Sequence, residues 1–354
     1  MLGIDARAAR ATWTVASITA LLLVAYLVRR TLLIFTAALL LAYLLSPLVS
    51  LVQRLFSGKV SRNLSLAVVY MLLVALLVSG GAALGSRIIE QASNLAARLP
   101  ELLQNAQKLF ERPLPAWIEP IKADLQAALQ SQLEQGAKAI VPLLQKTAEQ
   151  LLSVLGNLVF LLLVPILSFF FLKDARSIRQ GFLDQLVQGP ERMLLEDIFA
   201  DVHVLLAQFM RALVLLGSAS FVFYGISLGI LGVPYALLLA TVAGLLEFIP
   251  VLGPLVASLI ILLVAGFSGY PHLLWILIFM GVYRLFQDYV LQPYLMSSGV
   301  ELHPLLVIFG ALCGEQIGGV PGMFLSVPAL ATLRVVYVRV QKARQAARTV
   351  SANS

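Results

Sequence analysis

The sequence predicts an all-α, polytopic integral membrane protein with about six to eight membrane segments. Hydrophobic residues make up 60% of the 354 residues and charged residues only 12%, and the mean hydropathy is +0.92. Soluble domains carry about 25% charged residues, so this chain cannot cover a water-facing surface of its size. Apolar runs also recur at about 20 residues, the length that crosses a hydrocarbon core as a helix.

Six apolar runs meet or approach the length of a full crossing. They lie at residues 12–28, 31–52, 64–86, 150–172, 205–231 and 272–292. Two further runs, 235–268 and 303–340, are long but interrupted by glycine and proline. Their halves are short of a full crossing, which favours re-entrant hairpins over pairs of spans.

Residues 87–149 differ from the rest because they hold seven basic and seven acidic residues among apolar residues at helical spacing. The stretch "ERPLPAW" divides them into two amphipathic helices. The region is expected outside the cytoplasm, either as a solvated helical cap or as interfacial helices. The chain is thus divided into 1–86, 87–149, 150–204, 205–340 and a basic tail, 341–354, with a cytoplasmic amphipathic helix at 173–204.

Basic residues in the short loops set the expected orientation. If crossings alternate, one side holds Arg7 and Arg10, then Arg54, Lys59 and Arg62, and then the basic C-terminus. That side is expected to be cytoplasmic. Both termini are then cytoplasmic. Arg29 and Arg30 contradict this pattern, although their long stems can reach the opposite interface.

Cys313 is the one cysteine, so no intrachain disulfide or cysteine-based metal cage is possible. Its apolar surroundings predict a small, buried packing residue. No metal and no cofactor are expected, and the basic tail is a topology signal rather than a nucleic-acid site.

The stretch "EFIPVLGP" places Glu247 beside Pro250, Gly253 and Pro254 within an apolar region. The prolines and the glycine disfavour a continuous helix. Backbone groups freed by such a break must face protein or a water-filled cavity, and broken helices of this kind build transport sites. The interpretation favoured here is a buried or cavity-facing Glu247, and the alternative is a turn at the membrane surface.

The stretch "GALCGEQIGGVPG" repeats this combination around Glu315 and Gln316. Glycines at four-residue spacing let helix backbones approach closely, which explains the glycines without explaining the carboxylate. The two breaks are candidates for one pathway. The expected helix-break and packing residues are Gly310, Gly314, Gly318, Gly319, Pro321, Gly322 and Pro328.

Charge balance adds further candidates. Between Ala212 and Leu333 there is one basic residue, Arg284, against four acids, which are Glu247, Asp288, Glu301 and Glu315. A charge at the membrane centre costs about 2.5–3.5 kcal/mol. Arg284 and Asp288 are four apart and can pair, as a structural pair or a gate. Glu301 and His303 precede a helix start, where capping of the helix is the default role. Proton relay by His303 is the functional alternative.

Several classes of function are disfavoured. No HExxH, paired Gly-x-Gly-Asp or Walker A motif is present, so neither of these intramembrane hydrolase patterns nor ATP-driven transport is indicated. A carrier, a channel and a scaffold that binds partners through 87–149 remain.

The C-terminal half carries a set of motifs: "LGVPYALLLATVAGLLEFIPVLGP", then ELHP, then GGVPGMFLSVP. Together with "ALLLAYLLSPLV" near the N-terminus, they resemble the autoinducer-2 exporter family of bacterial membrane proteins, the PerM-like permeases. The resemblance implies a bacterial inner-membrane transporter that exports a small polar signal, with Na⁺ or H⁺ as a partner ion. It also implies a ring-shaped homo-oligomer, with a pentamer plausible. The alternatives are a Na⁺/H⁺ antiporter and a ring-shaped channel.

Overall fold

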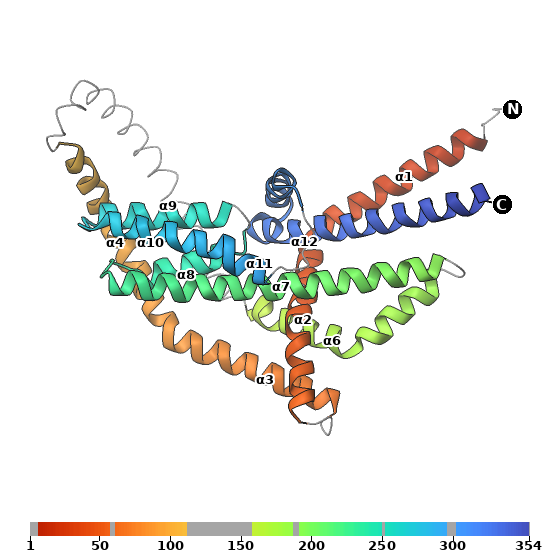
Figure 1. Cartoon of the computed structure of the whole chain (residues 1–354), viewed down its shortest axis with the longest axis horizontal. Coiled ribbons are helices and arrows are strands. Elements are labelled where there is room, and N and C mark those ends of the chain that lie inside the picture. Colours follow the sequence, from red (N-terminus) through yellow and green to blue (C-terminus); the bar gives the residue numbers. More distant parts are fainter. Residues whose placement is uncertain are drawn as a thin grey trace. The chain divides into compact units, whose positions relative to one another are not determined.

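The computed structural model describes residues 6–56, 61–111, 158–186, 191–249, 252–295 and 302–353, and these residues form helices and turns without any strand (Figure 1). The predicted all-α class is confirmed. In chain order, the helices are α1 (Ala6–Leu27), α2 (Arg29–Leu55), α3 (Arg62–Gly80), the π-turn η1 (Gly81–Gly85), α4 (Ser86–Glu111), α6 (Leu158–Leu186), α7 (Glu191–Ile230), α8 (Ala236–Leu246), α9 (Leu252–Phe267), α10 (Leu273–Phe286), the π-turn η3 (Gln287–Leu291), α11 (Gln292–Leu295) and α12 (Pro304–Asn353).

Five helices of the described residues are long and apolar enough to cross a membrane: Thr31–Leu55, Arg62–Arg98, Arg192–Ile230, Leu273–Leu295 and Pro304–Gln345. To within one residue, four of them contain the runs expected at 31–52, 64–86, 205–231 and 272–292. The run expected at 12–28 lies in α1, whose apolar part, Thr12–Leu27, is shorter than a full crossing. The run expected at 150–172 begins outside the described residues.

Residues 62–111 form one uninterrupted helical stretch, so the membrane segment expected to end at 86 continues directly into the amphipathic region. The glycine-rich π-turn η1 marks the junction, and single π-turns of this kind occur inside longer helices. The apolar side of α4 packs on α8 and α9, and Leu95 is 7% exposed in their shared core. The start of α4 is therefore packed on α8 and α9, while 112–149 lie outside the described residues and the cap stays a prediction there.

The chain divides into two units, each built from non-adjacent segments. Unit 1 comprises residues 1–44, 164–203 and 300–354, and unit 2 comprises 45–163 and 204–299. The five sequence-based segments follow chain order and stay a prediction.

Unit 2 holds α8, α9 and α10 side by side with the C-terminal part of α7 (Figure 1). Small residues allow the closest approach: a Cβ atom on Gly217 would lie 2.9 Å from the Gly244 carbonyl oxygen, and one on Gly244 would lie 2.8 Å from the Gly217 oxygen. Ala240, one turn before Gly244 on α8, lies against Gly225 of α7. Close packing of small residues is typical of membrane helices. Lipid is as apolar as leucine, so large apolar side chains gain little by leaving lipid for a helix interface.

Unit 1 is organised around a sharp break in α12. Gly318 and Gly319 leave helical geometry, and Gly319 adopts φ 62°, ψ −145°, a region open essentially to glycine alone. We call residues 304–317 the first limb and 320–353 the return limb. A Cβ on Gly314 would overlap the Gly322 backbone, and one on Gly322 would overlap Gly314, so the limbs fold back on each other.

The prediction that Cys313 is buried is wrong, because its side chain is exposed. The buried side of the first limb is a narrow strip of Gly310, Ala311 and Gly314. Cys313 flanks this strip instead of facing the return limb.

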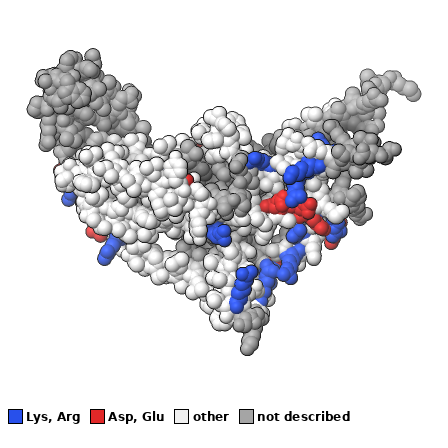
Figure 2. Space-filling model, viewed as in Figure 1, with Lys and Arg blue, Asp and Glu red and all other residues white. Residues whose placement is uncertain are grey.

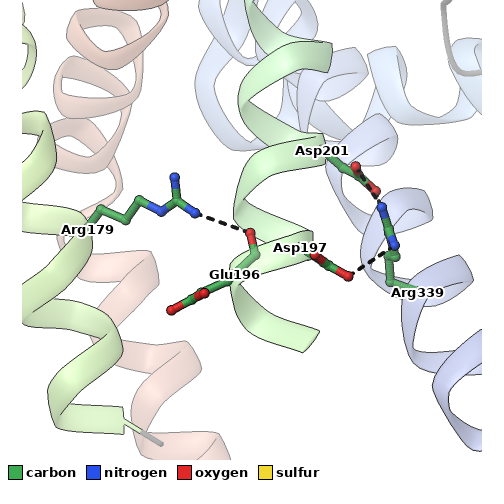
Figure 3. Close-up of polar contacts among 5 residues, drawn as sticks. All are labelled: Arg179, Glu196, Asp197, Asp201 and Arg339. Atoms are coloured by element: carbon green, nitrogen blue, oxygen red, sulfur yellow. Dashed lines mark hydrogen bonds and ion pairs between the residues drawn. The ribbon is translucent and has the colours of Figure 1, made fainter. Parts of the chain in front are cut away.

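The return limb is tied to α7 by ion pairs. Arg339 donates from Nη2 to Asp201 Oδ1 at 2.9 Å and from Nε to Asp201 Oδ2, and its Nη1 lies 3.3 Å from Asp197 Oδ2 (Figure 3). Arg179 of α6 donates to the Glu196 carbonyl oxygen of α7 at 3.4 Å. Elsewhere on the face shown in Figure 2, charged side chains gather in small groups separated by broad uncharged areas, as a membrane protein requires.

Candidate functional site

Glu247 lies at the end of α8, in the turn that leads into α9, and is 8% exposed. The turn is tight: a Cβ on Gly253 would overlap the Leu246 carbonyl, so glycine is required where the two backbones meet. Pro254 lies in the first turn of α9, where a missing N–H costs no helical hydrogen bond. Pro250 lies outside the described residues.

Two side chains from other elements hydrogen-bond to this carboxylate, and a third side chain hydrogen-bonds to one of them. Ser220 of α7 donates to Glu247 Oε1 at 2.8 Å, and Gln287 of η3 donates from Nε2 to Oε2 at 2.9 Å. Tyr283 of α10 lies 2.8 Å from the Ser220 hydroxyl. We call these four residues the Glu247 network; Ser220 and Gln287 are 0% and 1% exposed, respectively, and Tyr283 is 4% exposed.

The number of available protons fixes the direction of these hydrogen bonds when Glu247 is ionised. A serine hydroxyl has one proton, and Ser220 uses it for Glu247, so it accepts from the Tyr283 hydroxyl. Hydroxyl protons can rotate, so the Tyr283–Ser220–Glu247 chain can reverse when the carboxyl itself is protonated. The arrangement can therefore hold the carboxyl group in either protonation state.

Aromatic rings surround the network on the side of α10. Tyr224 and Phe279 each pack against Tyr283, with ring centroids 5.2 and 5.9 Å from it, and Phe223 packs at 5.4 Å. The Tyr283 ring of the network is thus held in place by neighbours on α7 and α10.

Arg284 and Asp288 form the predicted i, i+4 pair, with Nε 2.9 Å from Oδ2. Their side chains are 44% and 37% exposed, and both charges act on Glu247 electrostatically. The Arg284 Nη1 atom is buried and has no hydrogen-bond partner. A half-exposed ion pair among apolar side chains is costly against lipid, so this face of α10 is suited to water, another polar surface or a ligand.

The second break differs. Glu315 and Gln316 are exposed on the first limb, and Glu315 Oε2 accepts from the neighbouring Gln316 at 3.0 Å. Gly310 faces Leu330 and Ser326 of the return limb, and Gly318 faces Leu33 of α2. Pro321 and Pro328 lie within the return limb.

His303 caps the start of α12, as its default interpretation predicted. Its Nδ1 accepts from the Leu305 N–H at 3.3 Å and its carbonyl accepts from Leu306 at 2.8 Å. Glu301 lies outside the described residues. Among the residues that are described, no group of three or more His, Cys, Asp or Glu side chains could hold a metal ion.

Sequence reasoning missed Ser220, Tyr283 and Gln287. Gln287 had a usable signal, because it is a polar residue in an apolar helix next to Asp288. Ser220 had none, since Ser218 and Ser227 lie in the same apolar run. Only the packing of α7 on α8 distinguishes it.

The family model described as AI-2E family transporter matches residues 15–342. The chain is 26% identical to YueF of Bacillus subtilis over 310 residues, which covers 84% of this chain and 82% of that protein. It is 28% identical to MT0215 of Mycobacterium tuberculosis over 266 residues, 72% of this chain and 71% of the relative. A second Bacillus subtilis protein, YrrI, is 26% identical over 181 residues, 51% of each chain. The names of all three assign them a transport role by inference.

Proposed function

Since the chain belongs to the AI-2E transporter family, its activity is membrane transport and not catalysis, and we propose that it is a secondary exporter of a small polar metabolite or signal of the autoinducer-2 type. Such a role would place it in quorum sensing. No Walker A motif is present in the sequence, which favours secondary over ATP-driven transport.

The Glu247 network is the observation that carries this proposal. A carboxyl group that is 8% exposed and bonded only to neutral donors is costly in an apolar unit unless it has a task. Intramembrane carboxylates of transporters take up and release cations as the site opens to water. Glu247 is therefore the proposed coupling residue.

The rest of the pathway is proposed from the same unit. Arg284 and Asp288 present charges on the face of α10 next to the network, and the orphaned Arg284 Nη1 can donate to a passing polar molecule. At 11 and 16 residues, α8 and α9 are about 16 and 24 Å long, short of a ~30 Å core. We propose that they enter the membrane as a re-entrant hairpin, as broken helices at transport sites do. Glu315 is the second, weaker candidate.

Flux measurements in proteoliposomes test the proposal. The purified protein is reconstituted, loaded with a panel of small polar metabolites that includes autoinducer-2, and assayed under imposed proton or sodium gradients. Gradient-dependent efflux of a metabolite is expected. Sodium–proton exchange without metabolite movement would instead identify a Na⁺/H⁺ antiporter, and gradient-independent, non-saturating flux would identify a channel.

The proposed location is the bacterial inner membrane, with both termini in the cytoplasm. In a background where the exposed Cys313 is replaced by serine, Gln107→Cys should react with an impermeant thiol reagent applied to intact cells. Ala346→Cys should react only after the membrane is opened. The reverse pattern would overturn this orientation.

We also propose a homo-oligomer, with a pentameric ring as the expected form. The family resemblance supports this state, and the N-terminal helices are the expected subunit contacts. Many large apolar side chains of α1 to α3 are exposed in the single chain, among them Trp13, Leu21, Met71 and Leu76. A native mass measurement in lipid nanodiscs that finds only monomers would contradict this proposal.

A further inference from the structure

The N-terminus of α8 lacks the side chain that normally caps a helix. The residue before it, Tyr235, has φ 62° and makes no side-chain hydrogen bond to the first turn. The first N–H groups of any helix need partners from outside the helix. The Leu238 N–H finds one in Gln91 of α4, whose Oε1 accepts it at 2.9 Å across 147 residues of chain.

Gln91 is one turn before Leu95 and lies on the same side of α4. Leu95 is 7% exposed in the core formed with α7, α8, α9 and α10. Gln91 and Leu95 thus anchor α4 to α8 by one polar and one apolar contact. The remaining amide on this part of α4, Asn94, is exposed.

The position of α8 determines the position of Glu247. At 11 residues, α8 is shorter than the roughly 12–15 residues at which an isolated helix becomes even marginally stable. Its neighbours therefore hold it: Gln91 at its start, the small residues of α7 along its length, and the Leu246–Gly253 contact at its end. Because Glu247 directly follows the last residue of α8, displacement of the start of this short helix would tilt the helix and move Glu247.

We propose that Gln91 is a positioning residue for Glu247, and that the amphipathic helix α4 thereby sets the hydrogen-bonding geometry of the carboxyl group through α8. The proposal rests on the proposed function, since it assigns α4 a part in the work of the Glu247 site. It makes the amphipathic region a component of the site instead of a passive cap.

The groups that face Glu247 define what a displacement would change. From α7 it meets Ser220 and, further off, Tyr224, and from α10 and η3 it meets Tyr283, Arg284, Gln287 and Asp288. The donors on Ser220 and Gln287 favour the charged carboxylate. Loss of their alignment removes that preference, so the carboxyl would hold its proton to a higher pH.

The test uses the full-length protein in lipid nanodiscs and needs no substrate. Gln91→Met keeps the length and the apolar contact and removes the oxygen acceptor, whereas Gln91→Glu keeps an acceptor. Asn94→Ala is the matched control on the exposed side of α4. Hydrogen–deuterium exchange is measured on peptides of residues 236–247, and infrared spectroscopy follows the protonated carboxyl band, assigned by its loss in Glu247→Gln.

Gln91→Met should speed amide exchange in the first half of α8 about tenfold, the ratio expected for loss of a strong cap. It should also move the infrared titration midpoint of the Glu247 carboxyl to higher pH. Gln91→Glu and Asn94→Ala should match the wild type in both measurements, and exchange in residues 304–317 should not change in any variant.

Faster exchange with an unchanged Glu247 titration would make Gln91 a simple cap and would overturn the inference, as would no change in either measurement. If Gln91→Met does not fold, the test is made on Gln91→Glu. A difference from the wild type in its amide exchange or in its Glu247 titration would overturn the inference. Wild-type flux in Glu247→Gln would instead refute the proposed function and leave the exchange and infrared results standing.

Discussion

The segment around Glu247 and the segment around Glu315 both place a carboxylate beside a glycine-dependent reversal of the chain, but their surroundings differ. Glu247 is 8% exposed and accepts hydrogen bonds from Ser220 and Gln287 on other helices. Glu315 is exposed and accepts a hydrogen bond from its sequence neighbour Gln316. A Gly/Pro break next to an acid therefore does not by itself define a site; convergence of polar groups from other elements is also needed.

The geometry of each reversal explains the difference. At the first break, Glu247 itself lies in the turn, so its side chain meets the helices packed around the hairpin. At the second, Gly318 and Gly319 form the turn and glycines occupy the inner faces of both limbs. Where Gly314 and Gly322 meet, their backbones leave no room for a side chain, and Glu315 lies on the exposed side of the first limb.

The largest effect is expected from Glu247→Gln, which keeps the volume of the side chain and removes its charge. Flux should fall by about two orders of magnitude, the scale of losing a positioned proton-transfer group, and its pH dependence should flatten. The protein should still fold, because a neutral amide is cheaper to bury than an unpaired charge. Flux across a pH series in proteoliposomes measures both effects.

Glu315→Gln is the matched comparison. A much smaller loss of flux is expected, because Glu315 is exposed and its hydrogen bond comes from the adjacent residue, Gln316. An equal loss in both variants, with intact oligomers, would place the two breaks on one pathway. It would contradict the expectation that Glu315 matters less than Glu247. Normal flux of Glu247→Gln across the pH range would reduce the first break to a structural turn.

Glycine substitutions should have an intermediate effect, on stability. Gly319→Ala forces a Cβ into a glycine-only backbone region, at a cost of about 1–3 kcal/mol. Gly314→Ala inserts a methyl group into the Gly322 backbone and should cost about 1–3 kcal/mol. Gly281→Ala in α10 is the control, since a Cβ there meets nothing within 4 Å and alanine is the better helix former. Thermal unfolding in detergent should rank the control at or above the wild type, and a stable Gly314→Ala would disprove the tight hairpin.

The smallest effect is expected from Arg339→Lys on the return limb. Lysine keeps the charge but loses the two-pronged contact with Asp201. Because the two side chains are 35% and 39% exposed, solvent screens the ion pair and the loss of stability should be small. Hydrogen exchange in residues 320–345 should rise slightly, while Arg344→Lys, exposed on the same limb, should leave it unchanged. A large loss of stability would mean that the return limb depends on this ion pair more than on its glycine contacts.

Composition and local pattern were sufficient for the membrane class, most helix positions and the two breaks. Hydropathy, helix length and the conformational limits of glycine and proline act over a few neighbouring residues, so they can be read in order along the chain. The Arg284–Asp288 pair and the capping role of His303 were predictable for the same reason, since their partners are two to four residues away.

Burial and long-range partnership were decided by the tertiary structure alone. Glu247 acquires its network from residues 27 and 40 positions away, and the Ser220–Tyr283 contact spans 63 positions. Cys313 is the opposite case. Its sequence neighbours are apolar, yet its side chain lies outside the narrow buried strip of its helix and is exposed. A side chain's environment depends on which helix faces pack together, and that choice is made by contacts between distant segments.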